Sequence, residues 1–124
     1  MDRLGWVRRH YAESAEALDP DAFVEGLSDD VRMSRGTAVI VGREEVRKAV
    51  EQMGAAGLFA IRHDISGLWE PEPGVVIAEA SVTYRFETEE TPAVPVMSVF
   101  RWRGEEVADL RVYMDGARGP QRAS

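Results

Sequence analysis

Three side chains of this sequence, Tyr11, His63 and Asp115, are of types that move protons or hold a developing negative charge. Tyr11 lies in a segment whose apolar residues recur with a helical period, so its phenol is expected on the inward face of a helix. A buried phenol needs a hydrogen-bond partner. That partner is either a ligand carbonyl or an acceptor in the core, and both interpretations stay open.

His63 lies in the alternating stretch FAIRHDISGLWE, which predicts a strand. Four apolar residues share its predicted face, namely Phe59, Ile61, Ile65 and Trp69. Because an apolar environment disfavours the imidazolium, His63 is expected to be neutral and suited to act as a general base. The alternative is a histidine with a structural role only. Arg62 and Asp64 are expected on the opposite face as a solvated pair.

Asp115 ends the stretch EEVADLRVYMD. Its alternation predicts a strand that buries one face, formed by Leu110, Val112 and Met114. Strict alternation directs Asp115 away from that face, and only a bend or bulge at Tyr113–Met114 would turn the carboxylate inward. Asp115 is therefore either an acid–base residue or a carboxylate bonded to the first helix or to nearby backbone amides.

The elements that must position these groups follow from periodicity. One helix is predicted over residues 2–18 and another over 43–57. Between them a short helix is predicted after the N-cap Asp19, with Pro20 at its first position. Two short extended pieces are predicted over 31–36 and 37–42. From Phe59 onward the apolar period changes from helical to alternating, which predicts four long strands, over 59–70, 74–87, 94–103 and 105–115. Helices followed by hairpin-linked strands favour an α+β fold with an antiparallel sheet.

Composition excludes several classes of function. The 124 residues predict one domain, 1–116, with a flexible tail over 117–124. A net charge of −7 argues against nucleic acid and anionic membranes as partners. The start lacks the apolar core of a signal peptide and no apolar run reaches spanning length, so a cytoplasmic protein is expected. Without cysteine, and with His10 and His63 far apart in the sequence, we expect no metal and no other cofactor.

Three segments together resemble the NTF2-like superfamily, which includes SnoaL-like polyketide cyclases, ketosteroid isomerases and limonene-epoxide hydrolases. They are AESAEALDPDAFVEGLSDDVRM, GREEVRKAV and VFRWRGEEVADLRVYMD. In this order they resemble the opening helices, the next helix start and the closing hairpin of the superfamily. The resemblance implies a cone-shaped, curled antiparallel sheet wrapped on N-terminal helices, with an apolar pocket inside. Function varies widely on this fold, so the chemistry must be argued from the site.

The resemblance implies roles for several residues. Tyr11 corresponds to the ketosteroid isomerase tyrosine that donates a hydrogen bond to a developing enolate. Ser34 and Arg35 stand where that enzyme has its general base, and Ser98 stands where it has a protonated aspartic acid. Serine can still donate a hydrogen bond, whereas arginine cannot abstract a proton at neutral pH. Asp115 is the best match for the terminal aspartate that looks like the acid–base residue of SnoaL-like cyclases.

The Asp-Arg-Asp arrangement of the epoxide hydrolases has no counterpart, because the matching positions hold Ala80, Val82 and Val112. The residues expected to contact a small hydrophobic ligand are Arg35, Trp69, Tyr84, Ser98, Phe100, Val112 and Met114. The outer face of the sheet carries Met97 and Val99, and related proteins often dimerise through this face. A homodimer is therefore expected there.

Two functions of different classes follow. The first is a SnoaL-like enzyme with cyclase or isomerase chemistry on a hydrophobic carbonyl compound. In it Tyr11 and Ser98 polarise the oxygen, and His63 or Asp115 moves the proton. The second is a non-catalytic ligand-binding or dimeric accessory protein, which the missing catalytic aspartates favour. A titratable group that faces the pocket with a perturbed pKa would favour the enzyme.

Overall fold

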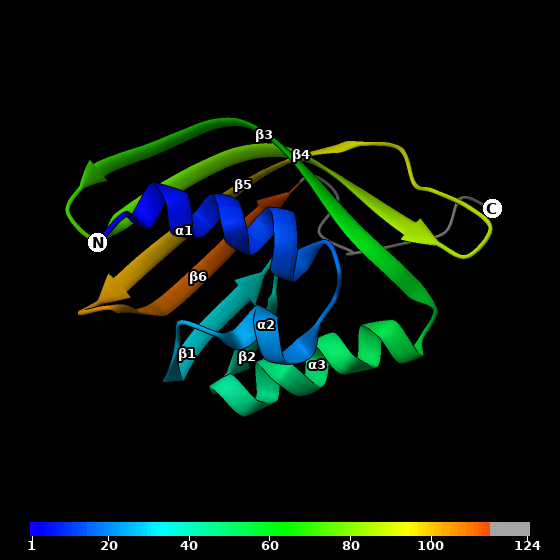
Figure 1. Ribbon diagram of the computed structural model, residues 1–124, viewed down its shortest axis with the longest axis horizontal. Coiled ribbons are helices and arrows are strands. Elements are labelled where there is room, and N and C mark those ends of the chain that lie inside the picture. Colours follow the sequence, from blue (N-terminus) through cyan, green and yellow to red (C-terminus); the bar gives the residue numbers. More distant parts are fainter. Residues whose placement is uncertain (115–124) are drawn as a thin grey trace.

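The computed structural model describes residues 1–114, which form one curled sheet with helices packed against it (Figure 1). The elements before the long strands are α1 (Arg3–Arg9), the π-helix η1 (His10–Ala15), α2 (Pro20–Val24), β1 (Leu27–Arg35), β2 (Ala38–Val41) and α3 (Arg43–Ala55). The long strands are β3 (Leu58–Glu72), β4 (Val75–Phe86), β5 (Val94–Arg103) and β6 (Glu106–Met114). Asp115 and the predicted tail 117–124 lie outside the described residues.

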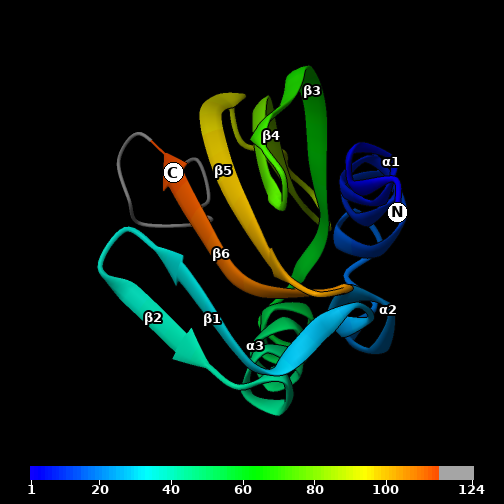
Figure 2. The same cartoon turned by 90° about the vertical axis from the view of Figure 1, so that its left-hand side faces the viewer.

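The six strands form one sheet in the order β2-β1-β6-β5-β4-β3. The sheet curls around the helices, which lie on its concave side (Figure 2). The predicted α+β fold with a curled sheet wrapped on helices is confirmed. One pairing differs from an all-antiparallel sheet, because β1 runs parallel to β6. Alternation within a strand indicates which face is buried but carries no information about the partner strand, so this pairing could not be predicted from periodicity.

The start of the chain is helical as predicted, but the first helix changes its geometry halfway. Asp2 caps α1 by accepting a hydrogen bond from the Gly5 backbone N–H at 2.9 Å. From His10 the turns widen into η1, and the helix ends before Leu18, whose φ of 52° lies in the left-handed region. None of the helices in residues 1–114 is long and apolar enough to cross a membrane.

The second helix follows its predicted signals. Asp19 caps it by accepting hydrogen bonds from the backbone N–H groups of Asp21 and Ala22, at 3.1 and 3.2 Å, and Pro20 occupies the first position. These contacts fix the chain reversal that places α2 beside η1.

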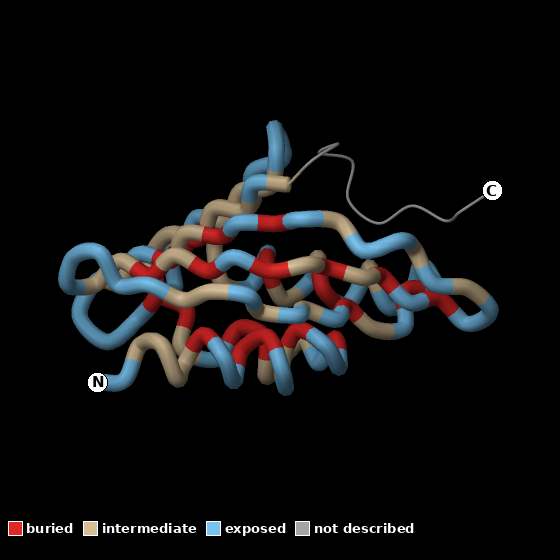
Figure 3. The backbone as a smooth tube through the Cα atoms, turned by 90° about the horizontal axis from the view of Figure 1, so that it is seen from above, coloured by how far each residue is buried: buried red, intermediate tan, exposed pale blue. Residues whose placement is uncertain are grey.

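The core fills the space between the concave face of the sheet and the helices, where the buried segments of both face one another (Figure 3). Aromatic side chains gather under α1. There Trp6 meets Phe100 and Trp102 edge to face, with ring centroids 6.1 and 5.5 Å apart. This end of the sheet is therefore filled by protein side chains.

Strand β3 departs from the predicted alternation at both ends. Its pairing with β4 shifts register between Leu58 and Ala60, between Ile65 and Gly67, and beyond Trp69. Each shift turns the following side chains to the other face. Phe59 and Trp69, both predicted to point inward, are therefore 65% and 49% exposed.

The central part of β3 keeps the predicted alternation. Ile61 is buried and His63 points inward, whereas Arg62 and Asp64 form a solvated pair on the outside, with Nη2 and Oδ1 3.4 Å apart. On the same outer surface Met97 of β5 pairs with Tyr113 of β6, and both side chains are exposed. The homodimer through this face stays a prediction.

Candidate functional site

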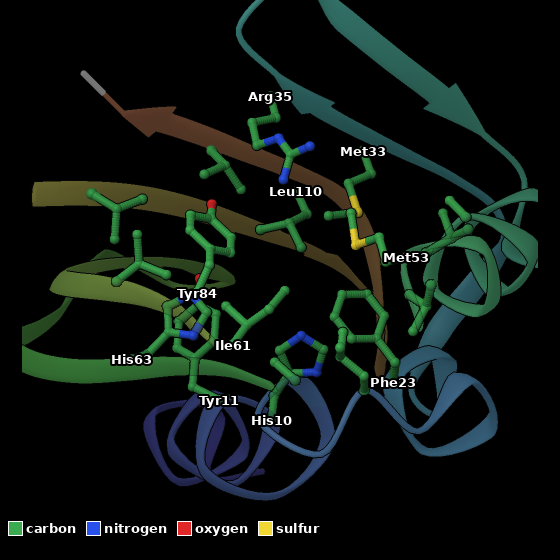
Figure 4. A pocket seen from close by; sticks show the side chains of 18 of the residues that line it. His10, Tyr11, Phe23, Met33, Arg35, Met53, Ile61, His63, Tyr84 and Leu110 are labelled. Carbon is green, nitrogen blue, oxygen red and sulfur yellow. The ribbon is translucent and has the colours of Figure 1, made fainter. Parts of the chain in front are cut away.

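A cavity of about 80 Å³ lies between the sheet and the helical segment η1–α2–α3 (Figure 4). Its wall is mostly apolar, and includes Phe23, Met33, Val50, Met53, Ile61 and Leu110. Four side chains bring polar groups or charge to this wall, namely His10, His63, Arg35 and Tyr84. An apolar cavity with few polar groups is the usual form of a small-molecule site.

His63 is the predicted base, and its imidazole faces the cavity from β3. The ring stacks on Tyr11 with centroids 4.0 Å apart and 17° between the planes. Its Nδ1 is buried and has no hydrogen-bond partner. Burial lowers the pKa of His63 from 6.5 to about 4, although Asp64 on the outer face and the Ile61 backbone act in the opposite direction. His63 is therefore neutral at pH 7.

His10 is a second imidazole at the cavity, and it is buried although the sequence did not select it as a site residue. Its ring stacks on Trp6 at 5.0 Å and lies 4.7 Å from the Phe23 ring. Its Nε2 has no partner, and burial, followed by the nearby His63, lowers the pKa of His10 from 6.5 to about 3. In Figure 4 His10 rises into the cavity beside Tyr11.

The π-helix explains how two consecutive residues reach the same cavity. In an α-helix the neighbours of an inward residue turn aside, whereas the wider turns of η1 leave both His10 and Tyr11 buried. A single turn of π-helix often occurs at functional sites. No residue type or spacing signals this change of geometry, which is why periodicity selected Tyr11 alone.

The structure brings Tyr11 and Ser98 together, and their hydroxyl groups form a hydrogen bond with one another. The Tyr11 hydroxyl donates to Ser98 Oγ at 2.6 Å, and both side chains are buried. Burial raises the pKa of Tyr11 above its ordinary value, while the bond to Ser98 opposes the rise. Tyr11 lines the cavity with its ring, whereas Ser98 does not line it. The predicted oxygen-binding pair is therefore a hydrogen bond within the core.

Tyr84 brings a phenol hydroxyl to the cavity, and Arg35 brings a positive charge. Their side chains face one another from β4 and β1 (Figure 4). The Tyr84 hydroxyl lies 3.7 Å from the Met114 sulfur, which is a weak acceptor. Burial raises the pKa of Tyr84, and the charge of Arg35 and a hydrogen bond with it oppose the rise.

The predicted ligand-contacting residues divide into two groups. Those that line the cavity are Arg35, Tyr84, Val112 and Met114. Trp69, Ser98 and Phe100 do not line it, and their contact with a ligand stays a prediction. Trp69 is turned outward by the register shifts of β3, and Phe100 sits at the end of β5 that the α1 side chains fill. Asp115 lies outside the described residues, so its orientation stays a prediction.

The described part of the chain offers little to a metal ion. Within residues 1–114, no group of three or more His, Cys, Asp or Glu side chains is arranged to hold one. At two positions that match the epoxide hydrolase arrangement, Val82 and Val112 place apolar side chains in the cavity wall. The chemistry available to the described site is therefore that of two neutral imidazoles, a phenol and a guanidinium.

Comparison with known proteins identifies the family. The profile of the SnoaL-like domain matches residues 7–110, so the chain belongs to the SnoaL-like domain family. The predicted resemblance to the SnoaL-like branch of the NTF2-like superfamily is confirmed. Among curated proteins none matches this chain.

Solved structures share the fold at low identity. An LEH-like epoxide hydrolase from M. tuberculosis has a TM-score of 0.78 and 17% identity, covering 90% of this chain and 81% of that one. A candidate SnoaL-like polyketide cyclase from Shewanella denitrificans OS-217 has a TM-score of 0.75 and 11% identity, covering 93% and 92%.

A hypothetical protein with a ketosteroid isomerase-like fold from Catenulispora acidiphila DSM 44928, in complex with trimethylamine, has a TM-score of 0.70 and 18% identity, covering 91% and 85%. At these identities the likeness shows the fold and not the reaction.

Proposed function

We propose that this protein is a SnoaL-like enzyme that moves a proton on a small carbonyl compound held in the cavity, in the manner of an isomerase or cyclase. The observation that carries the proposal is the buried Nδ1 of His63, which has no protein partner and belongs to a side chain at the wall of a mostly apolar cavity. A buried polar atom without a partner costs stability, and a ligand that supplies the partner relieves that cost.

The proposed step begins with a neutral base. His63 takes a proton from a carbon next to the ligand carbonyl. The electrons of the C–H bond form a C=C bond, and the carbonyl π electrons move to the oxygen, giving an enolate. The imidazolium then returns the proton to the same carbon or to another one, which regenerates the base. No co-reactant is needed.

The enolate oxygen needs donors, and the geometry favours Tyr84 over the predicted Tyr11. The Tyr11 hydroxyl is committed to Ser98, whereas the Tyr84 hydroxyl donates only to the weak acceptor of Met114 and has Arg35 beside it. A donor and a cation placed where negative charge develops stabilise the transition state. The same charge raises the pKa of His63 in the complex, because the imidazolium and the enolate attract one another.

The alternative function is a binding protein without catalysis. Two observations favour it: within the described residues no carboxylate lines the cavity, and the Tyr11 hydroxyl is used inside the core. This alternative keeps the cavity and its polar groups but requires no proton transfer.

Exchange of carbonyl α-protons for deuterium tests the proposal without knowledge of the product. The protein is incubated in D2O with 2-butanone, 2,3-butanedione or pyruvate, and the loss of α-proton signals is followed by NMR. We expect exchange above the buffer rate for at least one compound, and exchange at the buffer rate for His63→Gln. Arg62→Gln is the matched control, because Arg62 neighbours His63 but points to the outer face.

Two outcomes would contradict the proposal. If His63→Gln exchanges as fast as the wild type while Asp115→Asn does not exchange, the base is Asp115 and the role given to His63 is wrong. If no compound exchanges but NMR shift changes show that compounds bind at the cavity residues, the alternative of a binding protein is correct.

A further inference from the structure

Arg35 is the one permanently charged residue among the described residues that line the cavity. It is half-buried near the end of β1, where its strand neighbours are Ala38 of β2 and Val112 of β6. Within residues 1–114, no acidic side chain forms an ion pair with it. A guanidinium at the wall of an apolar cavity thus has no anionic partner from the described part of the protein.

Tyr84 adds a second donor at the same place. Its hydroxyl is buried, and its contact with the Met114 sulfur at 3.7 Å is long and weak. The hydroxyl hydrogen is therefore available to a stronger acceptor. The two donors come from different strands, β4 and β1, and their polar ends lie close to one another (Figure 4).

We propose that the cavity selects a small carbonyl compound that also carries a carboxylate, and that Arg35 binds this carboxylate while the Tyr84 hydroxyl donates to the carbonyl oxygen. The inference rests on the proposed function in one respect, that the cavity holds a ligand. A carboxylate accepts hydrogen bonds from the guanidinium, and its charge offsets that of Arg35. A neutral oxygen would leave the cation uncompensated as the ligand covers it.

The size of the cavity limits the rest of the ligand. Its 80 Å³ compares with about 150 Å³ for an apolar cavity that binds benzene, so the resting cavity takes only a few carbon atoms. Because Arg35 is half-buried, the carboxylate lies at the rim and only the apolar part needs space inside. Met33 and Met53 line the cavity, and methionine side chains adapt more easily than branched ones.

Isothermal titration with isobutyrate and isobutyramide tests the inference, because the two molecules share a shape and differ in charge. We expect the full-length protein to bind isobutyrate more tightly than isobutyramide by about tenfold or more. Arg35→Met should abolish this preference by weakening isobutyrate alone. Arg32→Gln is the matched control on the same strand, because its side chain is exposed and does not line the cavity, and it should keep the preference.

Salt provides a measurement that needs no variant. Raising NaCl from about 50 mM to about 500 mM should weaken isobutyrate binding and leave isobutyramide unchanged, because salt screens only the charged contact. This measurement decides the matter if Arg35→Met does not fold, as judged by circular dichroism.

The inference is overturned if the wild type binds both molecules equally or binds neither. It is also overturned if folded Arg35→Met keeps the preference for isobutyrate. Because the titration measures binding alone, its result is independent of α-proton exchange. Carboxylate binding without exchange would refute the proposed catalysis and retain the ligand class. Exchange of 2,3-butanedione without a preference for the carboxylate would retain the proposed catalysis and refute the ligand class.

Discussion

The buried imidazole of His10 should make the stability of this protein fall as the pH drops. Burial and the nearby His63 lower the pKa of His10 from 6.5 to about 3, so the unfolded chain takes up its proton more readily than the folded one. A histidine that folds in the neutral form therefore loses stability as the pH falls below about 6.5, and the loss stops near the folded pKa. Replacing His10 with Phe removes this dependence and keeps a ring of similar shape.

The size of the effect follows from the two pKa values. At about pH 5, protonation of the unfolded imidazole lowers the free energy of unfolding by about 2 kcal/mol relative to pH 7.5. His63, whose pKa is lowered to about 4, contributes about 2 kcal/mol more by the same reasoning. The wild type should thus lose about 4 kcal/mol over this window, and His10→Phe about half of that. The variant should also gain about 1 kcal/mol at pH 7.5, because it no longer buries the unpaired Nε2.

Urea unfolding followed by tryptophan fluorescence at several pH values between about 7.5 and 5 measures both effects. Asp30 interferes little in this window, because Arg103 and Ser28 lower its pKa to about 2 and its contribution is lost only as the pH falls from about 4 toward 2. If His10→Phe loses as much stability as the wild type, the buried neutral state assigned to His10 is wrong. An unchanged m-value shows that the variant unfolds from the same fold.

Two further substitutions test the packing around the site. Tyr11→Phe should lower the free energy of unfolding by about 1–3 kcal/mol. Ser98→Ala should cost much less in the Tyr11→Phe variant than in the wild type, because the 2.6 Å bond between the two side chains is already absent there. Additive effects in this double-mutant cycle would show that the hydroxyl bonds elsewhere. Gly26→Ala should cost about 1–3 kcal/mol, because Gly26 has a φ of 86° and a Cβ there would lie 2.8 Å from Trp6 Nε1. A neutral Gly26→Ala in thermal unfolding would contradict this turn geometry.

The fold was predictable because its signals are local. The cap at Asp19 and Pro20 and the alternation of the long strands each depend on a few adjacent residues, and the structure contains the helix and strands that they predict. The errors on β3 have one cause. Phe59 and Trp69 follow or precede register shifts, and a shift changes the facing of every later side chain without changing the composition of the strand.

The site was predictable only in part, because contacts between distant elements decide what each polar group can do. Tyr11 and Ser98 were selected as donors to a ligand oxygen, yet the curl of the sheet places them within reach of one another, and their hydroxyl groups bond to each other. His10 was passed over, since only the widened turns of η1 make it an inward neighbour of Tyr11.

The placement of unpaired groups is the strongest argument that this cavity has a function. His10 and His63 each have a buried ring nitrogen that lacks a partner, and both side chains line the same cavity. By the reasoning above, an apolar side chain at either position would make the folded state more stable at low pH. If these two positions only had to fill the core, imidazoles with unpaired ring nitrogens would add nothing to the stability of the fold. Their cost is explained if both imidazoles act on a ligand held in this cavity.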